Sequence, residues 1–301
     1  MNRILLSALA VAAGAGTMCA ENLFTGNQEV TWENTLSIEA EKFASAAVGD
    51  ELVVTIAEGA TDVMELKADG QWLPGTILTR LDGKTEVKAY LTDGMQAALK
   101  KYGLELCGPS FTVQSVDLND SDMAVPDGAV WAGFYWIDGG WNTLELYKTA
   151  FTGQNPKKLI INFSDEAEGS SFELNVLTAW DNDDMKLSLA DNVSISGRQA
   201  VIDLEKLPEG RTFASYFPEG TNALMIQGHV EDGASFNITS VVVEPYEPTS
   251  AIDDVAADSG NLVDVYSIFG VKVRTAVDAQ DATAGLAPGL YIVGNKKLLV
   301  K

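Results

Sequence analysis

The feature that most constrains the fold of this chain is an internal repetition of short β-type segments. Glu-Leu followed by Trp occurs at residues 65–72 and again at 173–180, and the two occurrences lie 108 residues apart. FTVQSV at 111–116 matches FNITSV at 236–241, at a separation of 125 residues. Matches in the same order in both halves indicate that one folding unit occurs twice. The larger second separation predicts longer loops in the second copy.

Each copy has the periodicity of β-strands. Residues 52–56 and 159–163 are short β-branched or aromatic runs, and residues 172–176 alternate apolar and polar side chains as a half-buried strand does. One short helix is expected at residues 94–101. Turn dipeptides recur between the runs, at Asp69-Gly70, Asp82-Gly83, Asp93-Gly94 and Asp232-Gly233. About eight strand candidates per copy predict all-β jelly-roll sandwiches, with an immunoglobulin-type sandwich as the alternative.

The N-terminus has the composition of a secretory signal. Arg3 precedes an apolar stretch at residues 4–15, and small residues follow around 17–20. The stretch is too short and too rich in Gly and Ala for a membrane span. Cleavage after Ala20 is expected, with lipid attachment at Cys19 as the alternative. The mature protein is therefore expected to be exported, and to be soluble outside the cell or attached to the outer-membrane surface.

The remaining boundaries follow polar and proline-containing stretches. The expected parts are a signal peptide (1–20), a first sandwich (21–119), a linker (120–126), a second sandwich (127–247), a second linker (248–261) and a C-terminal β module (262–301). Cys107 has no expected disulfide partner in the mature chain, so apolar packing alone must stabilise the modules. We expect this thiol in the core.

The strongly acidic composition disfavours several classes of partner. The chain has 43 acidic and 20 basic residues, and its formal net charge is −23. Proteins bind nucleic acids and anionic membrane surfaces mainly through Lys and Arg, so neither partner is expected. The simplest role of the charge is to keep a secreted protein soluble.

The sequence contains no recognisable catalytic set. His229 is the only histidine, which leaves one candidate base for nucleophilic catalysis and too few ligands for a zinc site. No glycine-rich phosphate loop is present. Paired carboxylates for glycoside hydrolysis stay open in so acidic a chain, but each repeat is small. A protein without enzymatic activity is therefore predicted.

The six tryptophans provide candidates for sugar binding. Sugar rings stack on exposed aromatic rings, while amides and carboxylates bond their hydroxyls. The candidate ligand-binding residues are Trp72, Gln71 and Asp69 in the first copy, Trp180, Asp181 and Asn182 in the second, and Tyr135 and Trp136 in a cluster with Trp131 and Phe134 that the first copy lacks. The alternative is that Trp72 and Trp180 are packing residues, repeated because the fold repeats.

Two further expectations concern tryptophan packing and metal binding. Trp32 and Trp141 each precede a predicted strand and are expected in the core. Asp181, Asp183 and Asp184 are candidate ligands for a structural calcium ion, because calcium prefers oxygen ligands. A solvated acidic loop is the alternative, and no other cofactor is expected.

The C-terminus resembles the sorting domain of type IX secretion found in the Bacteroidota. The motifs are Val265-Tyr266, Phe269-Gly270, Gly285-Leu286 before Pro288-Gly289, Tyr291, and a terminal basic strand. Short alternating strands with turns at Phe269-Gly270 and Gly294-Asn295 are expected there. The resemblance implies export across the outer membrane by that machinery, and surface attachment or release. An ordinary small β domain is the alternative.

The repeated modules resemble the tandem β-sandwich modules of secreted glycan-degrading proteins from the same bacteria. The resemblance is carried by residues 32–36, 72–75 and 103–113. It implies a galactose-binding-like sandwich and carbohydrate binding. The leading hypothesis is therefore polysaccharide binding at the cell surface or outside it. The alternative is a structural or adhesion protein that makes protein contacts and has no sugar site.

Overall fold

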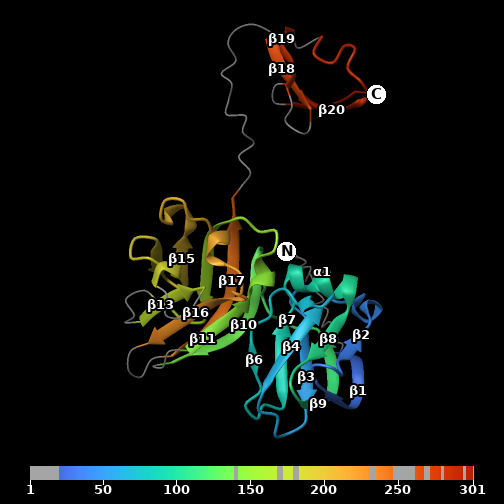
Figure 1. Ribbon diagram of the computed structural model, residues 1–301, viewed down its shortest axis with the longest axis vertical. Coiled ribbons are helices and arrows are strands. Elements are labelled where there is room, and N and C mark those ends of the chain that lie inside the picture. Colours follow the sequence, from blue (N-terminus) through green and yellow to red (C-terminus); the bar gives the residue numbers. More distant parts are fainter. Residues whose placement is uncertain are drawn as a thin grey trace, which may run out of the picture. The chain divides into compact units, whose positions relative to one another are not determined.

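The computed structural model describes residues 20–138, 142–167, 172–178, 183–230, 235–246, 262–267, 272–278, 281–293 and 296–300. Apart from one α-helix and a few 3-10 turns, the regular structure of these residues is β. They form two compact units, which divide between Pro245 and Tyr246 (Figure 1). Within the described part, no helix is long and apolar enough to cross a membrane. Nearly all of the predicted signal peptide lies outside these residues.

The first sandwich has two antiparallel sheets. One sheet runs in the order β1 (Ala20–Val30), β9 (Phe111–Asn119), β3 (Glu51–Ile56) and β7 (Glu86–Tyr90). The other runs β2 (Leu36–Ile38), β8 (Leu104–Cys107), β4 (Val63–Ala68) and β5 (Gln71–Trp72), with β6 (Thr79–Arg80) also paired to β4. The helix α1 (Asp93–Tyr102) confirms the predicted helix. Thr92 caps its N-terminus, because the Thr92 hydroxyl accepts from the Met95 amide.

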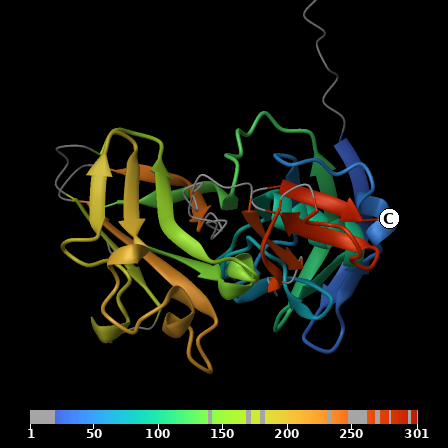
Figure 2. The ribbon, with the colours of Figure 1, turned by 90° about the horizontal axis from the view of Figure 1, so that it is seen from above.

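The second sandwich repeats this strand order. Its larger sheet runs β10 (Ala129–Ile137), β17 (Phe236–Pro245), β12 (Pro156–Phe163), β15 (Gln199–Asp203) and β14 (Val193–Ser196). Its smaller sheet runs β11 (Asn142–Tyr147), β16 (Ala223–Val230) and β13 (Phe172–Leu177). In both modules the first strand pairs with the last and the last with the third, as in a jelly roll. The predicted tandem jelly-roll fold is confirmed (Figures 1 and 2).

The first strands of the two modules also share a local distortion. The pairing of β1 with β9 shifts between Thr25 and Gln28, and that of β10 with β17 shifts between Ala132 and Tyr135. Beside each shift a glycine lies against an aromatic ring two residues earlier. A Cβ atom at Gly26 would lie 3.0 Å from the Phe24 ring, and one at Gly133 would lie 2.9 Å from the Trp131 ring. Equivalent positions in the two modules can therefore be compared residue by residue.

The two sandwiches are joined by backbone pairing. The Leu78 amide donates to the Glu145 carbonyl at 2.9 Å, and the Tyr147 amide donates to the Thr76 carbonyl at 3.2 Å. The segment that follows β5 in the first module thus extends the β11 edge of the second. Gly75 permits this approach, because a Cβ atom there would lie 2.8 Å from the Val130 carbonyl oxygen.

An aromatic stack lies at the same junction. The indole of Trp72 is nearly parallel to the ring of Tyr147, with centroids 4.6 Å apart and an angle of 4°. Tyr147 is only 4% exposed. Neither its hydroxyl nor the Trp72 indole N–H has a hydrogen-bond partner among the described residues. Leaving such a group buried and unpaired costs stability.

Replacing Tyr147 by Phe is expected to raise the free energy of unfolding by about 1 kcal/mol, because the change removes an unpaired buried hydroxyl. Burial, and then the carboxylate of Glu65, raise the pKa of Tyr147. The unfolded chain therefore loses this proton first, and the wild-type free energy of unfolding falls as the pH rises above about 10. The Tyr147→Phe variant lacks this proton, so its free energy of unfolding decreases less steeply as the pH rises. Urea unfolding at neutral and alkaline pH measures both effects; a clear loss of stability at neutral pH would contradict them.

The C-terminal unit is one small antiparallel sheet. Its strand order is β19 (Lys272–Asp278), β18 (Leu262–Ser267), β20 (Gly289–Val293) and β21 (Lys296–Val300). Its buried core is formed by Val265, Ala282 and Val293. The turns predicted at 269–270 and 294–295 lie outside the described residues, but the strands on either side of each pair antiparallel. The predicted C-terminal β module is confirmed.

Two predictions about single residues have different outcomes. Cys107 is buried as predicted, and burial raises the pKa of its thiol, which disfavours a reactive thiolate. The core position expected for Trp32 is wrong. Its side chain is 49% exposed, and the Lys67 ammonium lies 5.6 Å from its ring centroid. Trp32 lies in the bend between β1 and β2, where the alternation of a strand does not apply. Trp141 lies outside the described residues.

Candidate functional site

The candidates at residues 69–72 lie on a tight hairpin between β4 and β5. Asp69 and Gly70 have φ angles of 53° and 70°, as a type I′ turn requires. Asp69 and Gln71 are exposed, whereas Trp72 is half-buried and stacked on Tyr147. One face of the Trp72 indole is therefore covered by the second module. The second-copy candidates Trp180, Asp181 and Asn182 lie outside the described residues.

The calcium candidates are only partly described. Asp181 is outside the described residues, Asp183 begins a 3-10 turn (Asp183–Met185), and the side chain of Asp184 is exposed. Within the ranges given above, no group of three or more His, Cys, Asp or Glu residues is placed to hold a metal ion. The prediction of a calcium site therefore gains no support from the described side chains.

The outer face of the larger sheet in the second sandwich is arranged in rows. Alternation along β12 places Leu159, Ile161 and Phe163 in the core. The residues between them point outward, and strand register aligns each with its neighbours. The rows across the sheet are Asp203–Lys158–Glu244, then Val201–Ile160–Val242, then Gln199–Asn162–Ser240. The chemistry of the face thus changes from charged to apolar to amide and hydroxyl.

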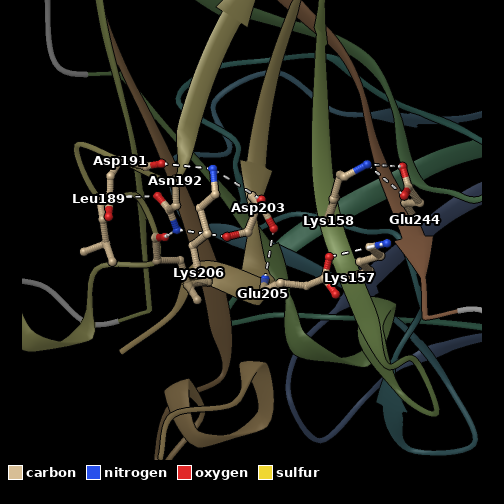
Figure 3. Close-up of polar contacts among 10 residues, drawn as sticks. Lys157, Lys158, Leu189, Asp191, Asn192, Asp203, Glu205, Lys206 and Glu244 are labelled. Carbon is tan, nitrogen blue, oxygen red and sulfur yellow. Dashed lines mark hydrogen bonds and ion pairs between the residues drawn. The ribbon is translucent and has the colours of Figure 1, made fainter. Parts of the chain in front are cut away.

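Ion pairs occupy the charged end of this face. Figure 3 shows Lys158 beside Glu244, at 2.9 Å, and Lys157 beside Glu205, at 3.4 Å. Lys206 lies 3.5 Å from Asp203 in the same group. These carboxylates therefore have cationic partners, and such partly exposed pairs contribute little to stability.

The amide row forms a hydrogen-bonded ladder. The Gln199 side-chain Nε2 donates to Asn162 Oδ1 at 2.9 Å, and Asn162 Nδ2 donates to Ser240 Oγ at 2.7 Å. Ser240 is only 2% exposed, so it anchors the ladder. Beside the ladder is a pocket of about 290 Å³. Its lining residues are Ala124, Pro126, Ile160, Asn162, Gln199, Thr239, Ser240 and Val242.

Exposed aromatic rings lie at the β10 edge of the same face. Phe134 and Trp136 alternate with inward-facing residues and are 64% and 52% exposed. Trp136 is paired in register with Asn237, which lies two positions before the pocket residue Thr239. At about 3.4 Å per residue, that spacing is roughly 7 Å along β17. The rings and the pocket are therefore adjacent parts of one surface.

A tyrosine of the first module joins this aromatic surface. The ring centroid of Tyr90, on β7, lies 6.1 Å from that of Phe134, and the rings are nearly perpendicular. Its hydroxyl donates to Glu51 Oε1 at 2.9 Å. Burial, and then this bond to Glu51, raise the pKa of Tyr90 to about 12, so the phenol stays neutral at physiological pH. We call Tyr90, Phe134 and Trp136 the aromatic patch.

The other predicted members of the aromatic cluster face inward. Tyr135 is half-buried against the core, and its hydroxyl donates to the Thr143 carbonyl. Trp131 is buried. Of the predicted ligand residues, only Trp136 therefore combines a described position with a well-exposed ring.

The equivalent face of the first module is chemically different. The matching bulges align Asn27 and Glu29 with Phe134 and Trp136. At the ladder, strand register aligns Thr55 with Asn162 and Glu86 with Gln199. Aromatic and amide positions of the second module are thus polar or acidic in the first.

Comparisons with known proteins give little further information. No protein-family model matches the sequence, and no curated protein matches it. Among solved structures, the chain is similar to SGBP-B of the Bacteroides ovatus mixed-linkage glucan utilization locus, determined in complex with a mixed-linkage heptasaccharide. The match has a TM-score of 0.30 and 20% identity, and covers 33% of this chain and 28% of that one. A likeness at this level does not carry an argument about function.

Sequence reasoning missed Tyr90 and the amide ladder. Tyr90 reaches Phe134 only because the modules pack together, and no local pattern encodes that contact. Gln199, Asn162 and Ser240 come from three separate strands. These residues align only in the register in which the three strands pair, and the sequence of short strands does not define that register.

Proposed function

We propose that this protein binds carbohydrate, without catalysis, on the outer face of its second sandwich. The observation that carries the proposal is the pair of exposed rings, Phe134 and Trp136, beside an uncharged pocket with a ladder of amides. Sugar rings have apolar C–H faces that stack on aromatic rings, and their hydroxyls bond amides. Large exposed aromatic groups gathered at one place mark interaction sites in soluble proteins.

The composition of the face supports binding rather than hydrolysis. Hydrolysis of a glycosidic bond usually needs two carboxyl groups flanking the bond. The pocket is lined by no carboxylate, and the carboxylates of Asp203 and Glu244 at the far end of the face are paired with lysines. This arrangement can hold a sugar but offers it no acid and no nucleophile.

We further propose that the protein acts at the cell surface or outside the cell. The support is the signal-like N-terminus and the resemblance of residues 262–301 to a type IX sorting domain. The shared strand order of the two sandwiches supports an origin by duplication and the domain boundaries expected from the sequence. Export machinery would then be a transient partner of the C-terminal module.

A second candidate function is a structural or adhesion role without sugar binding. It is favoured by Trp72, which stacks on Tyr147 in the junction instead of standing free. In that case the aromatic patch would contact a protein. The two functions differ in what Trp136 binds.

A polysaccharide screen with the full chain tests the proposal. In affinity electrophoresis we expect retardation by at least one neutral polysaccharide. The change Trp136→Ala should weaken binding at least tenfold, as expected for the loss of a central aromatic anchor. Trp32→Ala is the matched control, because Trp32 is 49% exposed and Trp136 is 52% exposed. No binding to any polysaccharide would favour the second candidate. Binding that survives Trp136→Ala unchanged would contradict a sugar site on this face.

A further inference from the structure

We infer that the pocket beside the aromatic patch is a subsite for one uncharged sugar unit, recognised through a pair of neighbouring hydroxyls. This inference rests on the proposed function and specifies its ligand class. It also places recognition on the outer face of the second sandwich and not on the equivalent face of the first. Three features of the pocket lead to this inference. They are the direction of the hydrogen bonds in the ladder, the volume and apolar lining of the pocket, and the absence of charge among its lining residues.

The ladder has a defined direction. The Gln199 amide nitrogen donates to Asn162, whose own nitrogen donates to the buried Ser240 hydroxyl. Gln199 Oε1 then remains an acceptor, and the second N–H of Asn162 remains a donor. A sugar hydroxyl both donates and accepts, so two adjacent hydroxyls of one ring match this acceptor and donor pair.

The rest of the pocket suits the apolar side of a single ring. Ile160 and Val242 form an apolar part of the lining, and Ala124 and Pro126 contribute from the segment that joins the two sandwiches. The volume of about 290 Å³ is at the small end of ligand pockets, which hold roughly 300 Å³ or more. One sugar unit therefore fits the pocket, and adjoining units of a polymer would reach the aromatic patch.

Charge restricts the ligand to neutral sugars. No lining residue of the pocket is charged, so an anionic unit would find no cationic partner there. The net charge of −23 repels polyanions as they approach. In the first sandwich, Glu86 stands where the pocket has Gln199. Asp117 stands where the pocket has Val242, because Asp117 pairs with Val53 on β3 as Val242 pairs with Ile160 on β12. The equivalent face of the first sandwich therefore lacks both the amide ladder and the neutral lining.

Calorimetric titration of the full chain tests this inference. The probes are mixed-linkage β-glucan, β-mannan and β-galactan, whose mannose and galactose units are each an epimer of glucose, and polygalacturonate as the anionic polymer. We expect binding to one neutral polymer to exceed that to its epimers, and polygalacturonate not to bind. Gln199→Ala and Asn162→Ala should each weaken the preferred interaction about fivefold, as expected for a lost neutral hydrogen bond. Both should also reduce the preference among epimers.

Controls separate the failure of this inference from that of the proposed function. Gln154→Ala is the matched control, because Gln154 is also exposed and is not one of the lining residues. If Trp136→Ala abolishes binding but Gln199→Ala leaves affinity and preference unchanged, the subsite is overturned and the proposed function stands. Tight binding of polygalacturonate would contradict the inference that the ligand is an uncharged sugar. Gln199 is exposed, so its variant stays informative even if Asn162→Ala fails to fold.

Discussion

Replacing Trp72 by Ala is expected to lower the free energy of unfolding by about 3 kcal/mol. The indole stacks on the buried ring of Tyr147, and its removal leaves a gap where the two sandwiches meet. The packing contacts that are lost lie beside the backbone hydrogen bonds that Thr76 and Leu78 make to the second sandwich. We therefore expect these hydrogen bonds to weaken as well. Urea unfolding followed by circular dichroism measures the change.

Trp32→Ala is the control for this experiment. Trp32 has the same side chain but is 49% exposed, so its loss should change stability by less than about 0.5 kcal/mol. Equal and small effects for both variants would contradict the structural role of Trp72. Such a result would favour the earlier prediction that Trp72 is a ligand-binding residue.

Replacing Ile161 by Ala is expected to cost about 4 kcal/mol, whereas Ile160→Ala should cost less than about 1 kcal/mol. The two residues are neighbours on β12 and lose the same atoms. Ile161 is fully buried in the core, and Ile160 lines the open pocket on the other face. Comparison of the urea midpoints therefore measures which face of the strand is buried.

The opposite order of costs would have a clear meaning. A strand shifted by one residue moves every side chain to the other face. Asn162 would then point into the core, and the ladder with Gln199 and Ser240 would not exist. The pair of variants thus tests the geometry on which the proposed site rests, without a ligand.

Much of the fold could be predicted from local patterns. Alternation at residues 172–176 predicted β13, and the repeated β-type segment at 236–241 predicted β17. Asp69-Gly70 predicted the turn between β4 and β5. The repeated order of these patterns predicted two sandwiches of one kind. These features depend on near neighbours in the sequence, so the sequence is enough to specify them.

The site was less predictable because it depends on long-range packing. Trp72 and Trp136 look alike in the sequence, but one stacks in a junction and the other stands exposed. The difference arises because residues 76–78 add to the edge of β11, which brings Tyr147 over Trp72. The same packing places Tyr90 beside Phe134. No local periodicity encodes either contact.

Hydroxyl-radical footprinting with a bound neutral polysaccharide tests the central claim most directly, because it reports which side chains the ligand covers. We predict that saturating ligand protects Trp136 and Phe134 from oxidation and leaves the equally exposed Trp32 unchanged. Binding that leaves Trp136 and Phe134 as reactive as in the free protein would contradict a ligand site on the outer face of the second sandwich.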